Sequence, residues 1–303
     1  MTKALPLLLA VSAFAQEDAV FRGGVSVVRV DTQVVEGKRV VSGLGKDDFV
    51  VTDDGTPVAI DYFGRETEPL WLILLLDVSG SMHRHLQEMS RVARSALGRL
   101  GRDDRVAVVY FAGKSRLARA FTGDRVEASD SIVDSLREKS LHAGTSINAS
   151  LIEAAAEMRK GAEGKPGRRA IVILTDNGGL NFQASDDAAL SALFGADTVV
   201  NAIVTASAKP PQRRVGANPD FTVPDVFLIA SQTGGEVLRT EKGGEAFAEM
   251  LERVRTRYSL HYRPPEGAKP LSRRRINVDL NPAARKRYPR AEVRARSGYT
   301  VPN

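Results

Sequence analysis

The chain has 303 residues, of which 43% are hydrophobic and 26% are charged, and it contains no cysteine. This is an ordinary globular composition with enough length for one large domain or two smaller ones. The lack of cysteine excludes a disulfide framework, zinc–thiolate sites and thiol catalysis. The formal net charge of +6 concentrates in residues 263–296, which hold 11 Lys or Arg against 3 Asp or Glu. One interpretation of this basic excess is a surface that contacts nucleic acid or anionic lipid. Its arginines alternate with Ile276, Val278 and Leu280, which favours the solvated face of β-strands, so no nucleic-acid partner is expected.

Residues 1–15 have the pattern of a signal peptide. Lys3 supplies a positive start, residues 5–14 an apolar core, and Ala13-Phe14-Ala15 a cleavage site that leaves Gln16 as the new N-terminus. The apolar core is too short for a membrane span, and no other stretch is a transmembrane candidate. The alternative is an apolar N-terminus that is not processed. We therefore expect a secreted, periplasmic or otherwise extracytoplasmic protein.

Residues 20–66 predict short β-strands, with hairpin turns at Glu36-Gly37 and at Asp54-Gly55. Four aspartates in this segment suggest calcium as an alternative, but they lack the spacing of an EF-hand loop. Turn chemistry is the better explanation for them. The four are Asp47, Asp48, Asp53 and Asp54.

Strand and helix patterns alternate over residues 70–255, which predicts an α/β domain with a mostly parallel sheet. Its first strand is the unbroken apolar run of residues 71–76, typical of a strand buried on both faces. Asp77, Ser79 and Ser81 follow it, and a helix is predicted over residues 82–100. Ligands of open α/β sheets bind at the carboxyl ends of strands, so these three side chains lie at a candidate site.

Two further oxygen-bearing side chains occupy comparable places. Thr145 lies in a loop that opens a predicted helix over 147–159, and Asp176 follows an apolar strand over 169–174. Hydroxyl and carboxylate oxygens suit a hard cation such as Mg²⁺, Mn²⁺ or Ca²⁺. The alternative for the serines and Asp77 is helix N-capping.

This set of residues resembles the von Willebrand factor A (VWA) domain and its metal-ion-dependent adhesion site. The Asp-x-Ser-x-Ser pattern, the loop threonine and the second aspartate match in order and spacing. The resemblance implies a doubly wound, mostly parallel sheet flanked by helices. It also implies a metal site made by Asp77, Ser79, Ser81, Thr145 and Asp176.

In this family the hydroxyls bind the cation directly, and the aspartates bind it partly through water. The resemblance implies one open coordination position that accepts an Asp or Glu of a partner protein, and therefore a cation-dependent, adhesion-type binding module. The expected cation is Mg²⁺, with Mn²⁺ or Ca²⁺ as alternatives. His142 and Asn177 are expected at the rim that contacts the partner; the family often has glycine where Asn177 stands.

Two other functions are weighed against binding. One is a structural VWA module with no external ligand. The other is a Mg²⁺-dependent phosphatase of the haloacid dehalogenase type, whose second catalytic aspartate would fall on Ser79. His83 and His85 are the nearest bases, but their spacing turns them to different faces of a helix. We therefore expect no enzyme activity, and a monomer is favoured.

Residues 256–303 return to a period of two, with Tyr258, Leu260 and Tyr262 on one face. This segment and residues 20–66 are each too short to bury a good core alone. We expect them to pair as one discontinuous β-domain with the VWA domain (70–255) inserted between them and its metal edge directed away. Both flanks resemble those of secreted bacterial VWA-related proteins.

Overall fold

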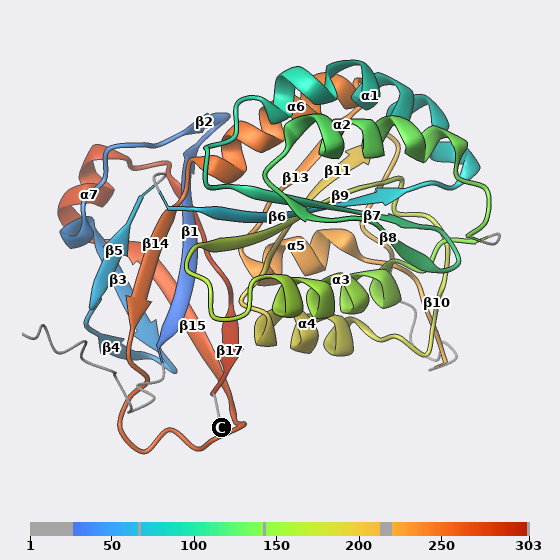
Figure 1. The fold of residues 1–303 in the computed structure, drawn as a ribbon. Helices are drawn as coiled ribbons and strands as arrows, with labels where there is room; N and C mark the ends of the chain where they lie inside the picture. The colour runs from blue at the N-terminus through green and yellow to red at the C-terminus, as the bar shows by residue number, and fades with distance from the viewer. Residues whose placement is uncertain (1–26, 66–67, 142–143, 213–219, 302–303) are drawn as a thin grey trace, which may run out of the picture.

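The computed structural model describes residues 27–65, 68–141, 144–212 and 220–301. Helices cover both faces of a six-stranded sheet, and smaller antiparallel sheets stand at one end of it (Figure 1). The predicted α/β fold with a mostly parallel sheet is therefore confirmed.

The central sheet has the strand order β13-β11-β9-β6-β7-β8. All neighbours in it are parallel except the edge strand β8, which runs antiparallel to β7. The strands are β6 (Leu70–Asp77), β7 (Arg105–Phe111), β8 (Ser115–Thr122), β9 (Arg168–Thr175), β11 (Val199–Thr205) and β13 (Val237–Thr240).

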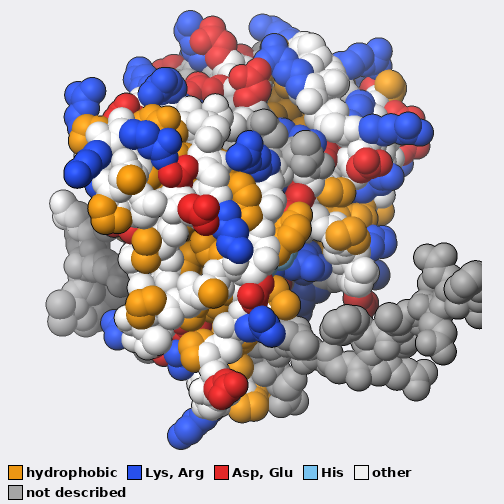
Figure 2. All heavy atoms as spheres, turned by 90° about the vertical axis from the view of Figure 1, so that its left-hand side faces the viewer, with side chains coloured by type: hydrophobic (Ala, Val, Ile, Leu, Met, Phe, Trp, Pro, Cys, Tyr) orange, Lys and Arg blue, Asp and Glu red, His pale blue; other side chains and the backbone are white. Residues whose placement is uncertain are grey.

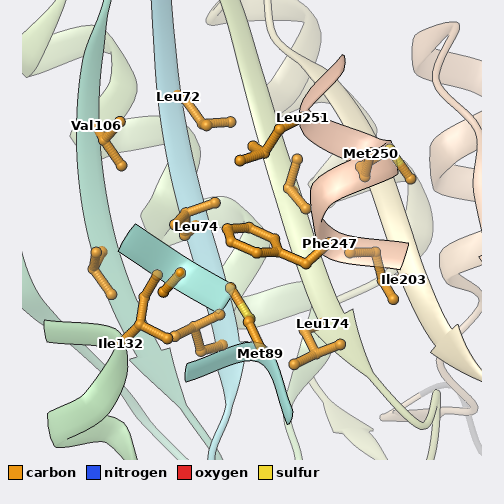
Figure 3. Packing of buried hydrophobic residues seen from close by; sticks show 14 of the residues in the cluster. Leu72, Leu74, Met89, Val106, Ile132, Leu174, Ile203, Phe247, Met250 and Leu251 are labelled. Atoms are coloured by element: carbon orange, nitrogen blue, oxygen red, sulfur yellow. The ribbon is translucent and has the colours of Figure 1, made fainter. Parts of the chain in front are cut away.

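Strand β6 lies at the centre of the sheet, and all eight of its residues are buried. Because successive side chains of a strand point to opposite faces, the apolar run supplies two cores. Leu72 and Leu74 belong to the core under α1 and α6, where Figure 3 shows Leu74 beside Phe247 of α6. Ile73 and Leu75 belong to the core on the other face. This double burial is the physical reason for an unbroken apolar strand.

Helices from two groups cover the two faces of the sheet (Figure 1). One group is α1 (His83–Leu97), α2 (Arg125–Asp134) and α6 (Gly243–Arg255); the other is α3 (Ile147–Gly161), α4 (Asp186–Gly195) and α5 (Val226–Thr233). Helix α2 was not predicted from the sequence. It begins at Asp124, whose carboxylate accepts hydrogen bonds from the amides of Val126 and Glu127, an N-cap that the sequence displays. No helix in the described part of the chain has the length and hydrophobicity of a membrane span.

The flanking sheets are built from strands near both ends of the described chain. One has the order β16-β1-β14-β5 with β2 on β1, and the other has the order β17-β15-β3-β4. They share one hydrophobic core and stand at the amino end of β6 (Figure 1). Their strands are β1 (Val28–Glu36), β2 (Arg39–Val40), β3 (Phe49–Asp53), β4 (Thr56–Val58), β5 (Tyr62–Gly64), β14 (Tyr258–Tyr262), β15 (Arg273–Leu280), β16 (Glu292–Arg294) and β17 (Gly298–Thr300). The described residues also form shorter elements, among them the helix α7 (Pro282–Arg287) and the two-residue strands β10 (Asn181–Phe182) and β12 (Phe221–Thr222).

Antiparallel pairing joins segments that are more than 200 residues apart in the sequence. Strand β1 pairs with β14, with Val28 opposite Tyr262, and β3 pairs with β15, with Val51 opposite Val278. Residues 28–64 and 258–301 therefore cover each other's apolar faces, which neither segment has the length to do alone.

Asp53 is a buried junction between these strands and not a turn residue, so its sequence interpretation was wrong. Its side chain has no exposed surface. It accepts hydrogen bonds from the Tyr262 hydroxyl at 3.1 Å, the Tyr299 hydroxyl at 2.8 Å and Arg274 Nε at 2.6 Å. Asp54 forms the turn, with a left-handed φ of 47°. A buried carboxylate needs this full set of donors, and they arrive on β14, β15 and β17.

The basic excess of residues 263–296 is largely paired with acids. Its arginines form ion pairs with acidic residues on the flanking sheets and on the central domain, for example Arg263 with Asp61 and Arg296 with Asp197. On the face that the flanking sheets turn outward, basic side chains are mixed with acidic and hydrophobic ones (Figure 2).

Candidate metal centre

Asp77 ends β6 and holds the turn that follows it. Its buried carboxylate accepts a hydrogen bond from the Ser79 amide at 3.0 Å through Oδ1 and one from the Thr175 hydroxyl at 2.7 Å through Oδ2. Burial raises the pKa of Asp77 to about 6, against the lowering effect of those hydrogen bonds. A buried carboxylate is stable as an anion when it faces a cation or enough donors.

The serine hydroxyls of the turn face Asp176 across the sheet edge. Ser81 donates to Asp176 Oδ2 at 2.6 Å, and the hydroxyl oxygens of Ser79 and Ser81 are 3.2 Å apart. Helix α1 begins after Met82 without a side-chain cap, and Ser79 makes no capping hydrogen bond either. The N-cap interpretation of the two serines is therefore wrong, and their hydroxyls converge with a carboxylate from the neighbouring strand.

Thr145 is held against the loop that follows Asp176. The amide of Leu180 donates to the Thr145 carbonyl at 3.3 Å. Gly179 has a φ of +99°, and a Cβ on it would lie 2.4 Å from the Thr145 carbonyl oxygen. Only glycine permits both this backbone conformation and this approach. Gly178 completes the loop by donating its amide to Asp176 Oδ1 at 2.8 Å.

The five sites predicted from the sequence thus lie at one edge of the sheet, at the carboxyl ends of β6 and β9 and before α3. This edge is opposite the flanking sheets (Figure 1). The donor set consists of hydroxyl and carboxylate oxygens, and the described residues contain no cluster of three or more His, Cys, Asp or Glu. These side chains fit a hard, oxygen-binding cation such as Mg²⁺ and do not fit zinc.

Asn177 does not lie at the rim, contrary to expectation. Only 8% of it is exposed. Its amide nitrogen donates to the Lys209 carbonyl at 3.3 Å, and its amide oxygen accepts from the Val226 amide at 3.0 Å, at the start of α5. With a φ of 58°, this residue turns inward and joins three segments beneath the site. His142 lies outside the described residues.

Thr175 is a positioning residue that the sequence interpretation missed. Its hydroxyl donates to Asp77 Oδ2, and its oxygen accepts from the Asn177 amide at 3.2 Å. It therefore links the two aspartate-bearing strands directly beneath the candidate ligands. Its place immediately before Asp176 was the available signal. Of the two histidines weighed as bases, His83 is exposed and His85 is buried in α1.

Thr175→Val tests this linkage. The change keeps the shape of the side chain but removes the donor to Asp77, so we expect cation affinity to fall by about 10- to 100-fold, as for other outer-shell partners of metal ligands. Titration calorimetry with Mg²⁺ measures the effect. Thr198→Val removes a buried hydroxyl far from the site, one bonded to the Ala196 carbonyl, and is the matched control. Equal affinities for the two variants would contradict the role of Thr175.

A mostly parallel α/β sheet whose carboxyl edge gathers Asp-x-Ser-x-Ser, a threonine and a second aspartate defines the VWA class of domain. Residues 72–179 match the family model described as "von Willebrand factor type A domain". The chain therefore contains a VWA domain, and the match spans all five candidate ligands. No curated protein matches the chain.

Several solved structures are similar to this chain. An aerotolerance-related membrane protein from Bacteroides fragilis NCTC 9343 is 20% identical, with 61% of this chain and 98% of that chain covered and a TM-score of 0.46. A conserved hypothetical protein BatB from Bacteroides thetaiotaomicron is 19% identical, with coverages of 61% and 97% and a TM-score of 0.44. A von Willebrand factor type A protein from Catenulispora acidiphila is 12% identical, with coverages of 93% and 74% and a TM-score of 0.47.

Proposed function

We propose that this protein is a divalent-cation-dependent binding module that recognises an acidic side chain of a partner protein. VWA domains are in general protein-interaction modules. The observation that carries the proposal is the convergence of Ser81 from the β6 turn on Asp176 from the end of β9, with a contact of 2.6 Å. This contact joins two strand ends at the edge where α/β sheets bind ligands.

The cation would be held by Ser79, Ser81 and Thr145, with Asp77 and Asp176 supporting them. Three of these five ligands are neutral hydroxyls, so the bound cation keeps much of its positive charge and attracts an anionic oxygen. Mg²⁺ suits such a site because it prefers oxygen ligands and commonly retains exchangeable waters.

The chain's own residues set up this recognition. Thr175 and the Ser79 amide orient the Asp77 carboxylate from opposite sides. Ser81 is exposed and Ser79 partly so, which leaves the hydroxyl side of the site open to a partner. In the described part of the chain, Ser79 and Ser81 are hydrogen-bonded to each other and to Asp176, and not to a histidine or lysine, which favours binding over catalysis.

We place this activity outside the cytoplasm, on the basis of the signal-peptide pattern in residues 1–15. Those residues lie outside the described part of the structure, so this placement rests on the sequence.

Affinity capture from source lysate and cell envelope tests the function. The bait is the protein in Mg²⁺, compared with EDTA and with Asp77→Ala. We expect a partner retained only by the wild-type protein in Mg²⁺ and released by free aspartate-containing peptide. Retention that EDTA does not change would show that binding does not depend on the cation, and no retained partner would argue for a structural VWA module. Mg²⁺-dependent turnover of a phosphate ester that is lost in Asp77→Ala would replace binding by catalysis.

A further inference from the structure

A second site is suggested at the opposite end of the sheet from Asp77. A cavity of about 340 Å³ lies between the flanking sheets and the amino ends of β9 and β11. Its walls come from β1, β5 and β14 on one side, and from the turns that lead into β9 and β11 on the other. Pockets between two layers of a protein are common places for small ligands.

Three arginines of this cavity are hydrogen-bonded to backbone carbonyls and not to carboxylates. Arg168 and Arg169 donate their terminal nitrogens to backbone carbonyls at the carboxyl ends of α3, α4 and α6. Their Nε atoms are buried and have no hydrogen-bond partner among the described residues. Only 4% of Arg168 is exposed. Arg29 makes one long hydrogen bond, of 3.5 Å, to the Gly167 carbonyl. None of the three forms an ion pair within the described part of the chain.

Two carboxylates face the other end of the cavity and compete for one hydroxyl. The Ser259 oxygen is 2.7 Å from Glu68 Oε2 and 3.3 Å from Asp31 Oδ1. A serine hydroxyl has a single proton to donate, and the shorter contact goes to Glu68, which is also hydrogen-bonded to Tyr62. The Asp31 carboxylate is thus left short of a donor. Burial raises the pKa of Asp31, although the nearby charges of Arg168 and Arg257 act to lower it; the charge of Glu68 adds to the rise.

The remaining ionisable groups of the cavity are already neutralised. Asp197 pairs with Arg296 at 2.8 Å. The pKa of His261 is lowered by burial and then by the charge of Arg29, so this side chain is neutral at pH 7. Arg29 at one end and the carboxylates of Asp31 and Glu68 at the other therefore have no ion-pair contact in the described part of the chain. Arg168 and Arg257 lie close enough to Asp31 for their charge to act on it.

The two charged ends have a defined spacing. Arg29 and Asp31 are two residues apart on β1, opposite His261 and Ser259 of β14 respectively. Side chains at such positions share a face of the strand and are about 7 Å apart. A ligand with one negative and one positive group at this separation would pair both ends at once.

We propose that this cavity binds a small zwitterion of the amino-acid or short-peptide class, with its ammonium group between Asp31 and Glu68 and its carboxylate against Arg29. A dianion would place negative charge beside the two carboxylates, and a diamine would place positive charge beside the arginines. Both are rejected by like-charge repulsion. The site is independent of the metal centre at the other edge.

Titration calorimetry with three probes of similar length tests the charge pattern: glycylglycine, succinate and putrescine. We expect saturable binding of glycylglycine, at least about tenfold tighter than either of the other two. Equal or tighter binding of succinate or putrescine would overturn the zwitterion assignment. Failure of all three to bind would show that the cavity is a hydrated interface and would overturn the site.

Variants locate the binding within the cavity. Arg29→Gln and Asp31→Asn should each weaken glycylglycine binding at least about tenfold, whereas Arg275→Gln, an exposed arginine on β15, should not. Thermal unfolding confirms that each variant is folded, and Ser259→Ala, which keeps both charges, should retain binding. Asp77→Ala should bind glycylglycine like the wild type, which separates this site from the metal centre. Unchanged affinity in both Arg29→Gln and Asp31→Asn would refute the proposal.

Discussion

Replacing Asp77 by alanine is expected to abolish divalent-cation binding while the protein stays folded. Asp77 supports the ligand turn through the Ser79 amide and reaches β9 through Thr175. The change removes a buried charge and leaves one hydroxyl and one amide to find water. At a Mg²⁺ concentration of 100 Kd the wild type should gain about 2.7 kcal/mol of unfolding free energy, and the variant should gain none.

Calorimetry and thermal unfolding with and without Mg²⁺ measure these two effects. Asp103→Ala is the matched control, because Asp103 is an exposed aspartate in the turn before β7. It should bind and respond to Mg²⁺ like the wild type. Undiminished binding by Asp77→Ala would place the cation site elsewhere in the chain.

Asp53→Ala is expected to cause the largest loss of stability among single changes in the flanking sheets. Its carboxylate has no exposed surface and holds Arg274 at 2.6 Å together with the Tyr299 hydroxyl at 2.8 Å. Burial raises the pKa of the Tyr262 side chain, so it is a neutral donor to the same carboxylate. Removing the acceptor takes a buried partner from two hydroxyls and leaves Arg274 with Asp54 as its remaining ion-pair partner, and breaking a buried pair in this way costs about 3–5 kcal/mol.

Urea unfolding measures this loss of stability. A probe in the flanking sheets monitors their unfolding, and Mg²⁺ binding reports on the metal edge of the central sheet. Asp61→Ala is the control, since it removes an exposed partner of Arg263 on the same sheets and should change stability far less. Tyr299→Phe removes one hydrogen bond to a charged group and should cost about 1.5–3 kcal/mol. Similar midpoints for Asp53→Ala and Asp61→Ala would show that the buried junction does not hold the sheets together.

The sequence by itself determined the central sheet and the position of the candidate site within it. The apolar run of β6 specifies a strand buried on both faces, and alternating strands and helices specify parallel neighbours. Parallel strands end at the same edge of a sheet. Residues at the ends of these strands, such as Asp77 and Asp176, can therefore be placed close together from the sequence alone. The amphipathic flanks likewise predicted mutual cover, and β1 does pair with β14.

Only the tertiary structure decided which polar residues are exposed. Asp53 and Asn177 both read as loop residues, yet each is buried because its partners arrive from segments distant in the sequence: Arg274 on β15 for Asp53, and the start of α5 for Asn177. The same holds for the shared hydroxyl of Ser259, which lies between Asp31 and Glu68 only because β14 returns beside β1. Local sequence patterns encode periodicity and turns, whereas burial of a polar group depends on which distant donors the fold brings to it.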